Sequence, residues 1–379
     1  MPQPTPQQSR FIAGAMSGTS ADGVDIAIVE ITGRGLDMTA RLIHHHHRAY
    51  PRTLRDEIFA FRGGEIAGAN VLSRLAEMGR AISLTYAAAT NEALAAAQMK
   101  ASQLSAVAAH GQTLFHDPPN TLQWFDPSLV AAEVGCPVVS DFRRADLAAG
   151  GQGAPLVPFA DYILFRHPTK SRVLLNLGGI ANLTHLPAGA NLDRITAFDT
   201  GPANCISDHL CRKHDPTGPG YDEHGQRAAR GRVNVAIVDR MLANDYFHKP
   251  PPKSTDGPEL IALFEAAVTA ASTSLIPDDL LATACLITAR SVARAMPAYD
   301  EAFVAGGGVY NHELMMRLGD EGLRLRPQEQ AGIPMNPSAK EALAFALLGA
   351  ATLDGVPSNV PGVTGAKQAV VLGSITPRP

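Results

Sequence analysis

Residues 11–30 read FIAGAMSGTSADGVDIAIVE, in which two apolar runs enclose the segment MSGTSADG. The runs at 11–16 and 24–31 have the length and composition of strands, and Gly, Ser and Asp between such runs are typical of a turn. Both strands are apolar enough for a protein core. A turn so rich in hydroxyl and acidic groups at that place therefore needs a reason beyond simple chain reversal.

The same order recurs farther along the chain. A third strand follows at 38–49, and helical spacing of apolar residues predicts a long helix within 65–99. About 160 residues after the first pattern, the strands 173–177 and 181–186 flank a second glycine turn, and a third strand ends at Asp199. We therefore expect an α/β protein of two similar halves, with an N-terminal domain over 11–150 and a C-terminal domain over 151–379. The last segment of the chain could instead pack back on the first domain. Residues 1–10 are expected to form a disordered tail.

Composition narrows the possible classes of protein. The chain has 379 residues, of which 45% are hydrophobic and 18% charged, and a net charge of −4. These values fit a soluble globular protein and do not favour a nucleic-acid partner. No run reaches the roughly 18 apolar residues of a membrane span, and MPQPTPQQSR has no apolar stretch of a signal peptide. The four cysteines form no CxxC pair, so free thiols in a cytoplasmic protein are expected.

The first turn is a candidate anion site. Gly18 and Gly23 allow close approach of a phosphate, and the hydroxyls of Thr19 and Ser20 could donate to its oxygens. Asp22 could hold Mg²⁺ through water. The alternative is an ordinary hairpin turn with local side-chain hydrogen bonds, and local sequence leaves the two interpretations equally open.

Three further segments end a strand in glycine or a carboxylate. Gly178-Gly179 could form a second nest of amides, or only a tight hairpin. Gly306, Gly307 and Gly308 give more backbone freedom than a turn requires, which suits a flat ligand such as adenine. Asp199 is a candidate general base, with an N-cap or turn role as the alternative. Ligands gather at the carboxyl ends of strands in α/β proteins, which favours the functional interpretation of the set.

Polar side chains also follow two other buried strands. His110, Gln112 and Thr113 could contact sugar hydroxyls, although a single histidine is more often structural. Arg143, with Asp141 and Arg144, could bind an anionic group or form only ion pairs. The run His44–His47 is not expected to bind one metal ion, because successive side chains of a strand point to opposite faces.

Taken together, these segments resemble the anhydro-N-acetylmuramic acid kinase family over about residues 10–375. The resemblance rests on MSGTSADGVD, HGQTLFHDP, DFRRADLAAGGQGAPLVP, LNLGGIANLT, AFDTGPAN, YDEHGQRAARG, PPKST, GGGVYN, EALAFA and VTGA. It implies two ribonuclease-H-like domains of the actin-like ATPase fold, with the nucleotide in the cleft between them. It further implies use of ATP and Mg²⁺ by a cytoplasmic homodimer in peptidoglycan recycling. The implied reaction opens the 1,6-anhydro bridge with water and phosphorylates O6.

The resemblance also assigns residues. Asp199 matches the catalytic aspartate, the base for the attacking water, and Arg143 and Glu341 fall at positions similar to substrate contacts. The ATP-binding set that it implies is Gly18, Thr19, Ser20, Ala21, Asp22, Gly23, Val24, Asp25, Gly178, Gly179, Gly306, Gly307 and Gly308. For Glu341 a structural alternative remains, because Ser338 and Glu341 have the spacing of a helix capping box.

Some positions depart from the family pattern. Ala203 stands in DTGPAN where glycine is usual, and Ala21 follows MSGTS where Leu or Met is usual. QWFDP and PPKSTDGPE differ from the usual substrate-side segments, which leaves the sugar less certain than the reaction. The alternatives are a kinase for another 1,6-anhydro sugar, such as levoglucosan, and a non-catalytic actin-like nucleotide-binding protein. The absence of GxGxxG disfavours a dehydrogenase.

Overall fold

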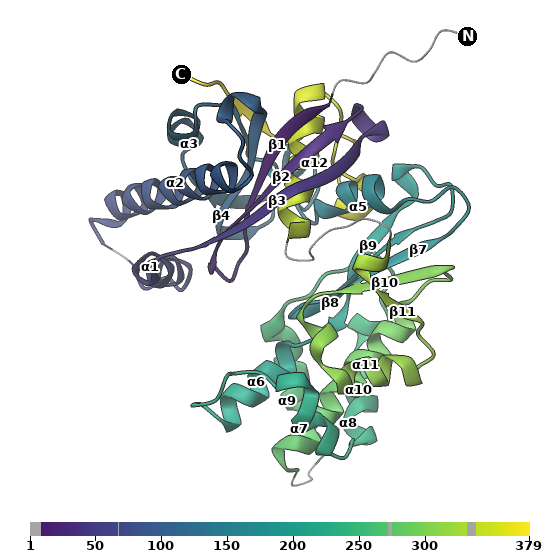
Figure 1. Cartoon of the computed structure of the whole chain (residues 1–379). Coiled ribbons are helices and arrows are strands. Elements are labelled where there is room, and N and C mark those ends of the chain that lie inside the picture. Colours follow the sequence, from purple (N-terminus) through teal and green to yellow (C-terminus); the bar gives the residue numbers. More distant parts are fainter. Residues whose placement is uncertain (1–8, 67, 272–274, 332–338) are drawn as a thin grey trace. The chain divides into compact units, whose positions relative to one another are not determined.

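The computed structural model describes residues 9–66, 68–271, 275–331 and 339–379. These residues form two compact units (Figure 1). The first unit contains the described residues up to Leu164 together with those from Ala339 onward, and the second begins at Phe165. Each unit is built on one β-sheet with helices packed against it.

The sheet of the first unit has seven strands in the order β12-β6-β4-β1-β2-β3, with β5 paired to β4. β1 is antiparallel to β2 and parallel to β4, and β2 is antiparallel to β3. The bounds are β1 Arg10–Ser17, β2 Gly23–Thr32, β3 Thr39–Ala49, β4 Leu104–Asp117, β5 Asn120–Trp124, β6 Val138–Ser140 and β12 Ser374–Thr376. The expected strand–turn–strand at 11–31 is confirmed, with the MSGTSADG segment at the turn between β1 and β2.

Helices from both ends of the chain pack on this sheet. α2, Val71–Ala96, contacts β2 and β3, whereas α12, Lys340–Asp354, contacts β1, β2 and β4. β1 can approach α12 closely only because Gly14 has no side chain: a Cβ there would lie 1.8 Å from the carbonyl oxygen of Ala342. The remaining helices of the unit are α1 Arg52–Arg62, α3 Pro127–Val134, α4 Arg144–Ala148, α5 Val157–Phe165 and α13 Pro361–Thr364.

The second unit has a five-stranded sheet in the order β11-β10-β7-β8-β9. Its strands are β7 Arg172–Leu177, β8 Ile180–Leu186, β9 Thr196–Pro202, β10 Glu301–Ala305 and β11 Leu325–Pro327. Its helices are α6 Cys205–His214, α7 Gln226–Arg230, α8 Val235–Leu242, α9 Gly257–Ala270, α10 Pro277–Ala295 and α11 His312–Asp320. The described helices of the chain include none with the length and apolar character that a membrane span requires.

The two sheets share one topology. In each, an antiparallel three-stranded meander (β1-β2-β3 and β7-β8-β9) is extended on its first strand by parallel strands, β4 and β6 in one unit and β10 and β11 in the other. This order, with the second strand antiparallel, is that of the ribonuclease-H-like fold. The expected pair of ribonuclease-H-like domains is thus confirmed, while the position of a nucleotide between them stays a prediction.

The boundary between the units differs from the expected one at 150/151. The glycine-rich stretch 149–153 is not a linker, because the buried carboxylate of Asp146 accepts hydrogen bonds from Gly153 N and Thr364 Oγ1, both 2.7 Å long. The first unit therefore continues through α5. The expected tail also ends earlier than residue 10: Arg10 lies in β1 and pairs with Asp354 at 2.6 Å, whereas residues 1–8 lie outside the described residues.

Candidate functional site

The turn between β1 and β2 exposes the groups expected to meet an anion. Thr19, Ser20 and Asp22 are exposed, and Ala21 N donates to Gly18 O at 3.2 Å to close the turn. Ala21 itself is buried and has a φ of +46°, a left-handed conformation that costs a non-glycine residue roughly 1 kcal/mol. Leu or Met would be strained in the same way, so the alanine at this position adds no strain of its own.

Gly23 and Val24, at the other end of the same turn, have structural roles. A Cβ on Gly23 would lie 2.3 Å from the carbonyl oxygen of Arg48, so glycine is required by the approach of β3. Val24 is fully buried in the core. Only the backbone of these two residues is available to a ligand.

Gln112 supports this turn from beneath. Its side chain is fully buried, its Oε1 accepts from Ser17 Oγ at 2.7 Å, and its Nε2 donates to Gly18 O at 3.1 Å. The expected contact between Gln112 and a sugar hydroxyl is therefore replaced by a contact with the turn. Thr113 Oγ1 accepts a longer bond, 3.4 Å, from Gln123.

His110 and Arg143 form a second buried pair in this unit. Arg143 Nε donates to His110 Nε2 at 2.9 Å, and the other ring nitrogen, Nδ1, contacts the carbonyl oxygen of Gly111 at 2.9 Å. A guanidinium can only donate and a carbonyl can only accept, so His110 is a neutral ring with its proton on Nδ1. Burial and the nearby Arg143 hold the pKa of His110 well below its usual range. Both ring nitrogens are thus engaged within the protein.

Arg143 retains donors for a ligand. Its Nη1 donates to Gly153 O at 2.8 Å, and its Nη2 makes no hydrogen bond with the described residues. Burial lowers the pKa of Arg143 to about 10, and Glu341 opposes that effect, so the guanidinium stays charged at neutral pH. Arg144 differs: it is exposed and pairs with Asp141 at 2.7 Å.

Glu341 lies in the first turn of α12. Its side chain is accessible, yet the surrounding protein raises the pKa of its carboxyl, an effect that Lys340 and Arg143 oppose. The N-cap of α12 is Ala339, so Glu341 is at the second helical position rather than the third that a capping box needs. Ser338 lies outside the described residues. The described geometry thus does not support the capping role of Glu341.

The histidine run contacts two carboxylates on opposite faces of β3. His45 Nε2 and His47 Nδ1 lie 2.9 and 3.2 Å from Asp25 Oδ1, whereas His46 Nε2 lies 2.9 Å from Glu92. The expectation that the run cannot converge on one ion agrees with this alternation. Within the described ranges, no group of three His, Cys, Asp or Glu side chains could hold a metal ion.

In the second unit, the Gly178-Gly179 turn is tied to the start of α6. Its two carbonyls accept from Asn204 N, Ala203 N and Cys205 N, each at 3.0 Å, and Asn204 Nδ2 donates to Gly178 O at 2.8 Å. Engaging the carbonyls holds the turn in one conformation. Ala203 takes part with an ordinary backbone conformation, so the alanine that replaces the usual glycine introduces no strain here.

Asp199 lies on the edge strand β9. Its Oδ2 accepts from Thr255 N at 3.1 Å, while Oδ1 accepts no hydrogen bond from the described residues. Burial raises the pKa of the carboxyl to about 6, and the bond from Thr255 limits the rise. A half-buried carboxylate with a free oxygen and such a pKa is suited to accept a proton near neutral pH.

The triple-glycine turn after β10 is partly explained by packing. Gly306 has a φ of +91°, and a Cβ there would lie 2.7 Å from the backbone of Leu177. A Cβ on Gly308 would lie 2.6 Å from Leu177 Cβ, whereas one on Gly307 would meet no atom closer than 3.8 Å. Two of the three glycines thus serve the contact with β7, and Gly307 is the one open to a ligand.

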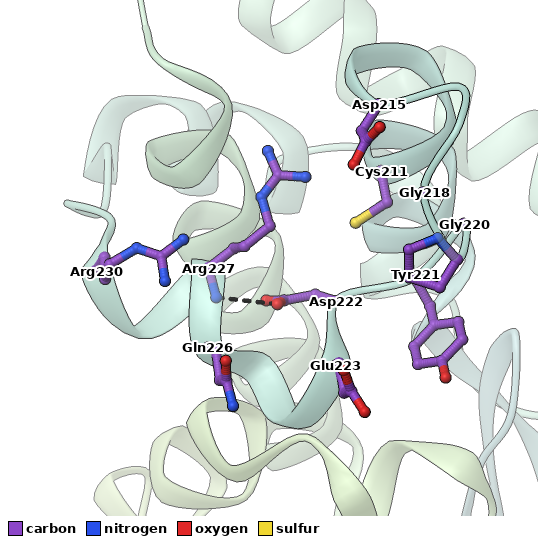
Figure 2. A pocket seen from close by; sticks show the side chains of 11 residues that line it. Cys211, Asp215, Gly218, Gly220, Tyr221, Asp222, Glu223, Gln226, Arg227 and Arg230 are labelled. Carbon is purple, nitrogen blue, oxygen red and sulfur yellow. Dashed lines mark hydrogen bonds between the residues drawn. The ribbon is translucent and has the colours of Figure 1, made fainter.

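The second unit also contains a cavity of about 200 Å³, shown in Figure 2. Some of its polar groups are already engaged: Arg227 Nε donates to Asp278 at 3.1 Å. Asp222 accepts at 2.9 Å from the backbone N of Ala228 and, at the same distance, from that of Arg227, the bond drawn in Figure 2. Asp222 thus bonds to the first turn of α7, which gives this residue of the matching stretch YDEHGQRAARG a structural role. None of the expected site residues lines this cavity.

Sequence reasoning missed the residues that hold Asp199. Tyr246 Oη donates to Asp199 O at 2.7 Å, and Asp199 N donates to Lys253 O at 3.1 Å. The segment PPKST matches the family pattern. Nothing in its local pattern indicates that it lies beside a strand about 50 residues earlier.

The chain is similar to known proteins in sequence and in structure. The family model described as "Anhydro-N-acetylmuramic acid kinase" matches residues 9–378. A protein of that name from Salinibacter ruber (strain DSM 13855 / M31) is 41% identical, with 97% of this chain and 96% of that protein covered. One from Bacillus cereus (strain AH820) is 38% identical over 97% and 99%. Among solved structures, the Acidaminococcus fermentans (R)-2-hydroxyglutaryl-CoA dehydratase component A is 12% identical over 90% of this chain and 99% of that one, with a TM-score of 0.43.

Proposed function

The chain belongs to the anhydro-N-acetylmuramic acid kinase family, and we propose that it uses ATP to convert 1,6-anhydro-N-acetylmuramic acid to N-acetylmuramic acid 6-phosphate and ADP. The observation that carries the proposal within this chain is Asp199, whose free carboxylate oxygen and pKa of about 6 suit a general base. The relatives at 38–41% identity support the choice of substrate.

In the proposed reaction, a water oxygen attacks C1 of the sugar and Asp199 takes a proton from that water. The bond between C1 and O6 breaks, and O6 attacks the γ-phosphorus while the bond to the β-phosphate oxygen breaks. A base contributes typically 10²- to 10⁴-fold to such a step. The rest of the catalysis depends on holding the phosphoryl group and neutralising its charge.

Each unit offers hydrogen-bond donors for that purpose. In the first, the exposed hydroxyls of Thr19 and Ser20 are placed on a turn that Gln112 supports. In the second, the Gly178-Gly179 turn is held by its carbonyls, which leaves its N–H groups as the donors for phosphate oxygens. Gly307 is the open position of the turn proposed to meet adenosine.

The exposed carboxylate of Asp22 fits Mg²⁺. No described residue pairs with it, and Mg²⁺ is usually bound by one or two carboxylates together with waters and substrate phosphates, so a cage of protein ligands is not required. Bound there, Mg²⁺ would neutralise phosphate charge. Asp25 is the weaker candidate, because His45 and His47 already contact its Oδ1.

Arg143 is proposed to bind the lactyl carboxylate of the sugar through its Nη2, which makes no hydrogen bond with the described residues. Glu341 of α12 is proposed as a second contact with the sugar. His110 then has a positioning role, since it contacts Arg143 and has no nitrogen left for substrate. A homodimer and a cytoplasmic location are proposed from the family resemblance alone.

The test is a coupled assay of ADP release with purified protein on 1,6-anhydro-N-acetylmuramic acid, levoglucosan and N-acetylmuramic acid. We expect the first sugar to be preferred, because levoglucosan lacks the carboxylate and N-acetylmuramic acid lacks the anhydro bridge. Preference for levoglucosan would assign the chain to another anhydro sugar. Turnover by Asp199→Asn close to that of the wild type would remove Asp199 as the base.

A further inference from the structure

Residues 246–255, here called the holding segment, make three hydrogen bonds to Asp199. Tyr246 Oη donates to the Asp199 carbonyl at 2.7 Å, Lys253 O accepts from Asp199 N at 3.1 Å, and Thr255 N donates to Oδ2 at 3.1 Å. The backbone of Asp199 is thus held on both its donor and its acceptor, and its carboxylate on one oxygen. The tyrosine is the one member of the three that acts through a side chain.

The sheet alone does not fix this part of β9. β9 is an edge strand with β8 as its single neighbour in the sheet. The pairing of Asn182 with Asp199 is followed by a register shift to Ala181 and Gly201, and Gly201 has a φ of +148°. The ladder is interrupted by a bulge directly after Asp199, so contacts on the other side of the strand help to fix its position. The holding segment supplies those contacts.

Tyr246 is well suited to act as a permanent donor. It is buried, with 6% of its surface exposed, and packs edge-on against Phe247 at 5.3 Å between ring centroids. Burial raises the pKa of its hydroxyl, and the charge of Asp199 raises it further. The hydroxyl therefore stays protonated over the working pH range.

Lys253 holds the tyrosine in turn. Its ammonium lies 4.8 Å from the centroid of the Tyr246 ring and donates to Tyr246 O at 3.0 Å. A cation over an aromatic face is attracted by the negative charge of that face. The lysine side chain and the tyrosine therefore act as one unit.

We propose that Tyr246 is a positioning residue that aims the Asp199 carboxylate at the attacking water, and that Lys253 holds Tyr246 for this task. The inference rests on the proposed role of Asp199 as the base. Misplacement of a catalytic group by about 1 Å can cost on the order of 100-fold in rate, so loss of one positioning bond is expected to reduce turnover without weakening substrate binding.

The experiment compares Tyr246→Phe with the wild type and with Tyr299→Phe. The control removes a hydroxyl that also bonds to backbone in the second unit, where it accepts from Arg324 N at 3.1 Å. We expect Tyr246→Phe to lower kcat about tenfold, while KM for both substrates stays within about twofold of the wild-type value. The acid limb of its pH–rate profile should move to higher pH, because the bond from Thr255 to the Asp199 carboxylate weakens. Tyr299→Phe should match the wild type. An unchanged kcat in Tyr246→Phe, or an equal loss in the control, would overturn the proposal.

A double variant separates this proposal from the one on which it rests. If Tyr246 acts through Asp199, then Tyr246→Phe should cause no further loss of the residual turnover of Asp199→Asn. An additional tenfold loss there would show that Tyr246 acts elsewhere. If Asp199→Asn itself turned over normally, the proposed base would be wrong, whatever Tyr246→Phe shows. Lys253→Met should reduce kcat in the same direction, and a rise in KM for ATP instead would overturn the role of Lys253.

Discussion

Arg143 Nε donates to His110 Nε2 across 2.9 Å, and this bond makes Nε2 of the buried histidine an acceptor rather than a donor or an acid. The guanidinium is held by His110 on one edge and by Gly153 O on another. What remains for a substrate is the other terminal nitrogen. His110, which the sequence predicts to contact a sugar, therefore supports the neighbouring Arg143 cation.

The first prediction concerns this support. His110→Phe keeps a ring against Phe345, whose centroid lies 4.9 Å away, but leaves Arg143 Nε without its acceptor. We expect KM for 1,6-anhydro-N-acetylmuramic acid to rise about tenfold and stability to fall by about 1–3 kcal/mol, because a buried donor loses its bond. Levoglucosan, without the carboxylate, should show a much smaller change. Equal rises for both sugars would contradict the assignment of Arg143 to the carboxylate.

The second prediction concerns the first turn. Gln112→Leu removes the acceptor of Ser17 Oγ and the donor to Gly18 O, so the turn loses its buried support. We expect KM for ATP to rise about tenfold while KM for the sugar stays within about twofold. Initial rates at varied ATP and sugar measure both values. Gln123→Leu is the control, since its amide bonds to Thr121 and Thr113 rather than to the turn; the same change there would argue against a specific role of Gln112.

The third prediction is a pH profile. A base must be ionised to accept a proton, and burial raises the pKa of Asp199 to about 6. Plots of kcat/KM against pH should therefore fall tenfold per unit below about pH 6. His110 should not contribute, because its pKa lies well below its usual range and it stays neutral. An acid limb near the ordinary aspartate value of about 4 would mean that burial does not act on this group.

The fourth prediction is that Asp199→Asn stabilises the protein. A carboxyl whose pKa is raised from 3.8 to about 6 on folding stabilises the fold when protonated, and this contribution is lost as the pH rises through about 6. At pH 7.5 the neutral asparagine avoids that cost, on the order of 2–3 kcal/mol. Urea unfolding should show the gain at pH 7.5 and its disappearance below about pH 4. A variant less stable than the wild type at pH 7.5 would show that the ionised carboxylate is favoured by its surroundings.

The fifth prediction separates the three glycines after β10. Gly306→Ala and Gly308→Ala should each destabilise by about 1–3 kcal/mol, because the new methyl would overlap Leu177 at 2.7 and 2.6 Å. Gly307→Ala meets no such atom, so its unfolding midpoint should stay near that of the wild type while KM for ATP reports on the adenosine contact. Thermal unfolding and ATP titration of the three variants measure the two effects. Equal destabilisation of all three would contradict the packing argument.

The sequence by itself determined the local framework. Two short meanders with polar or glycine turns, a long helix within 65–99 and the placement of Asp199 on the third strand of the second meander follow from the order of apolar residues. These features depend on neighbours along the chain, which is why periodicity reveals them. The conformation of Ala21 and the packing roles of Gly306 and Gly308 were not visible in the same way, since they depend on what lies across from them.

Only the tertiary structure decided which distant segments meet. α12 packs on β1 because Gly14 leaves room for it, so the C-terminal residues belong to the first sheet. His110 is a neutral acceptor because Arg143 lies beside it, and Asp199 gains its raised pKa from burial and its position from Tyr246 and Lys253. Each of these properties comes from a desolvated contact between residues about 30 to several hundred positions apart, and such contacts leave no period in the sequence.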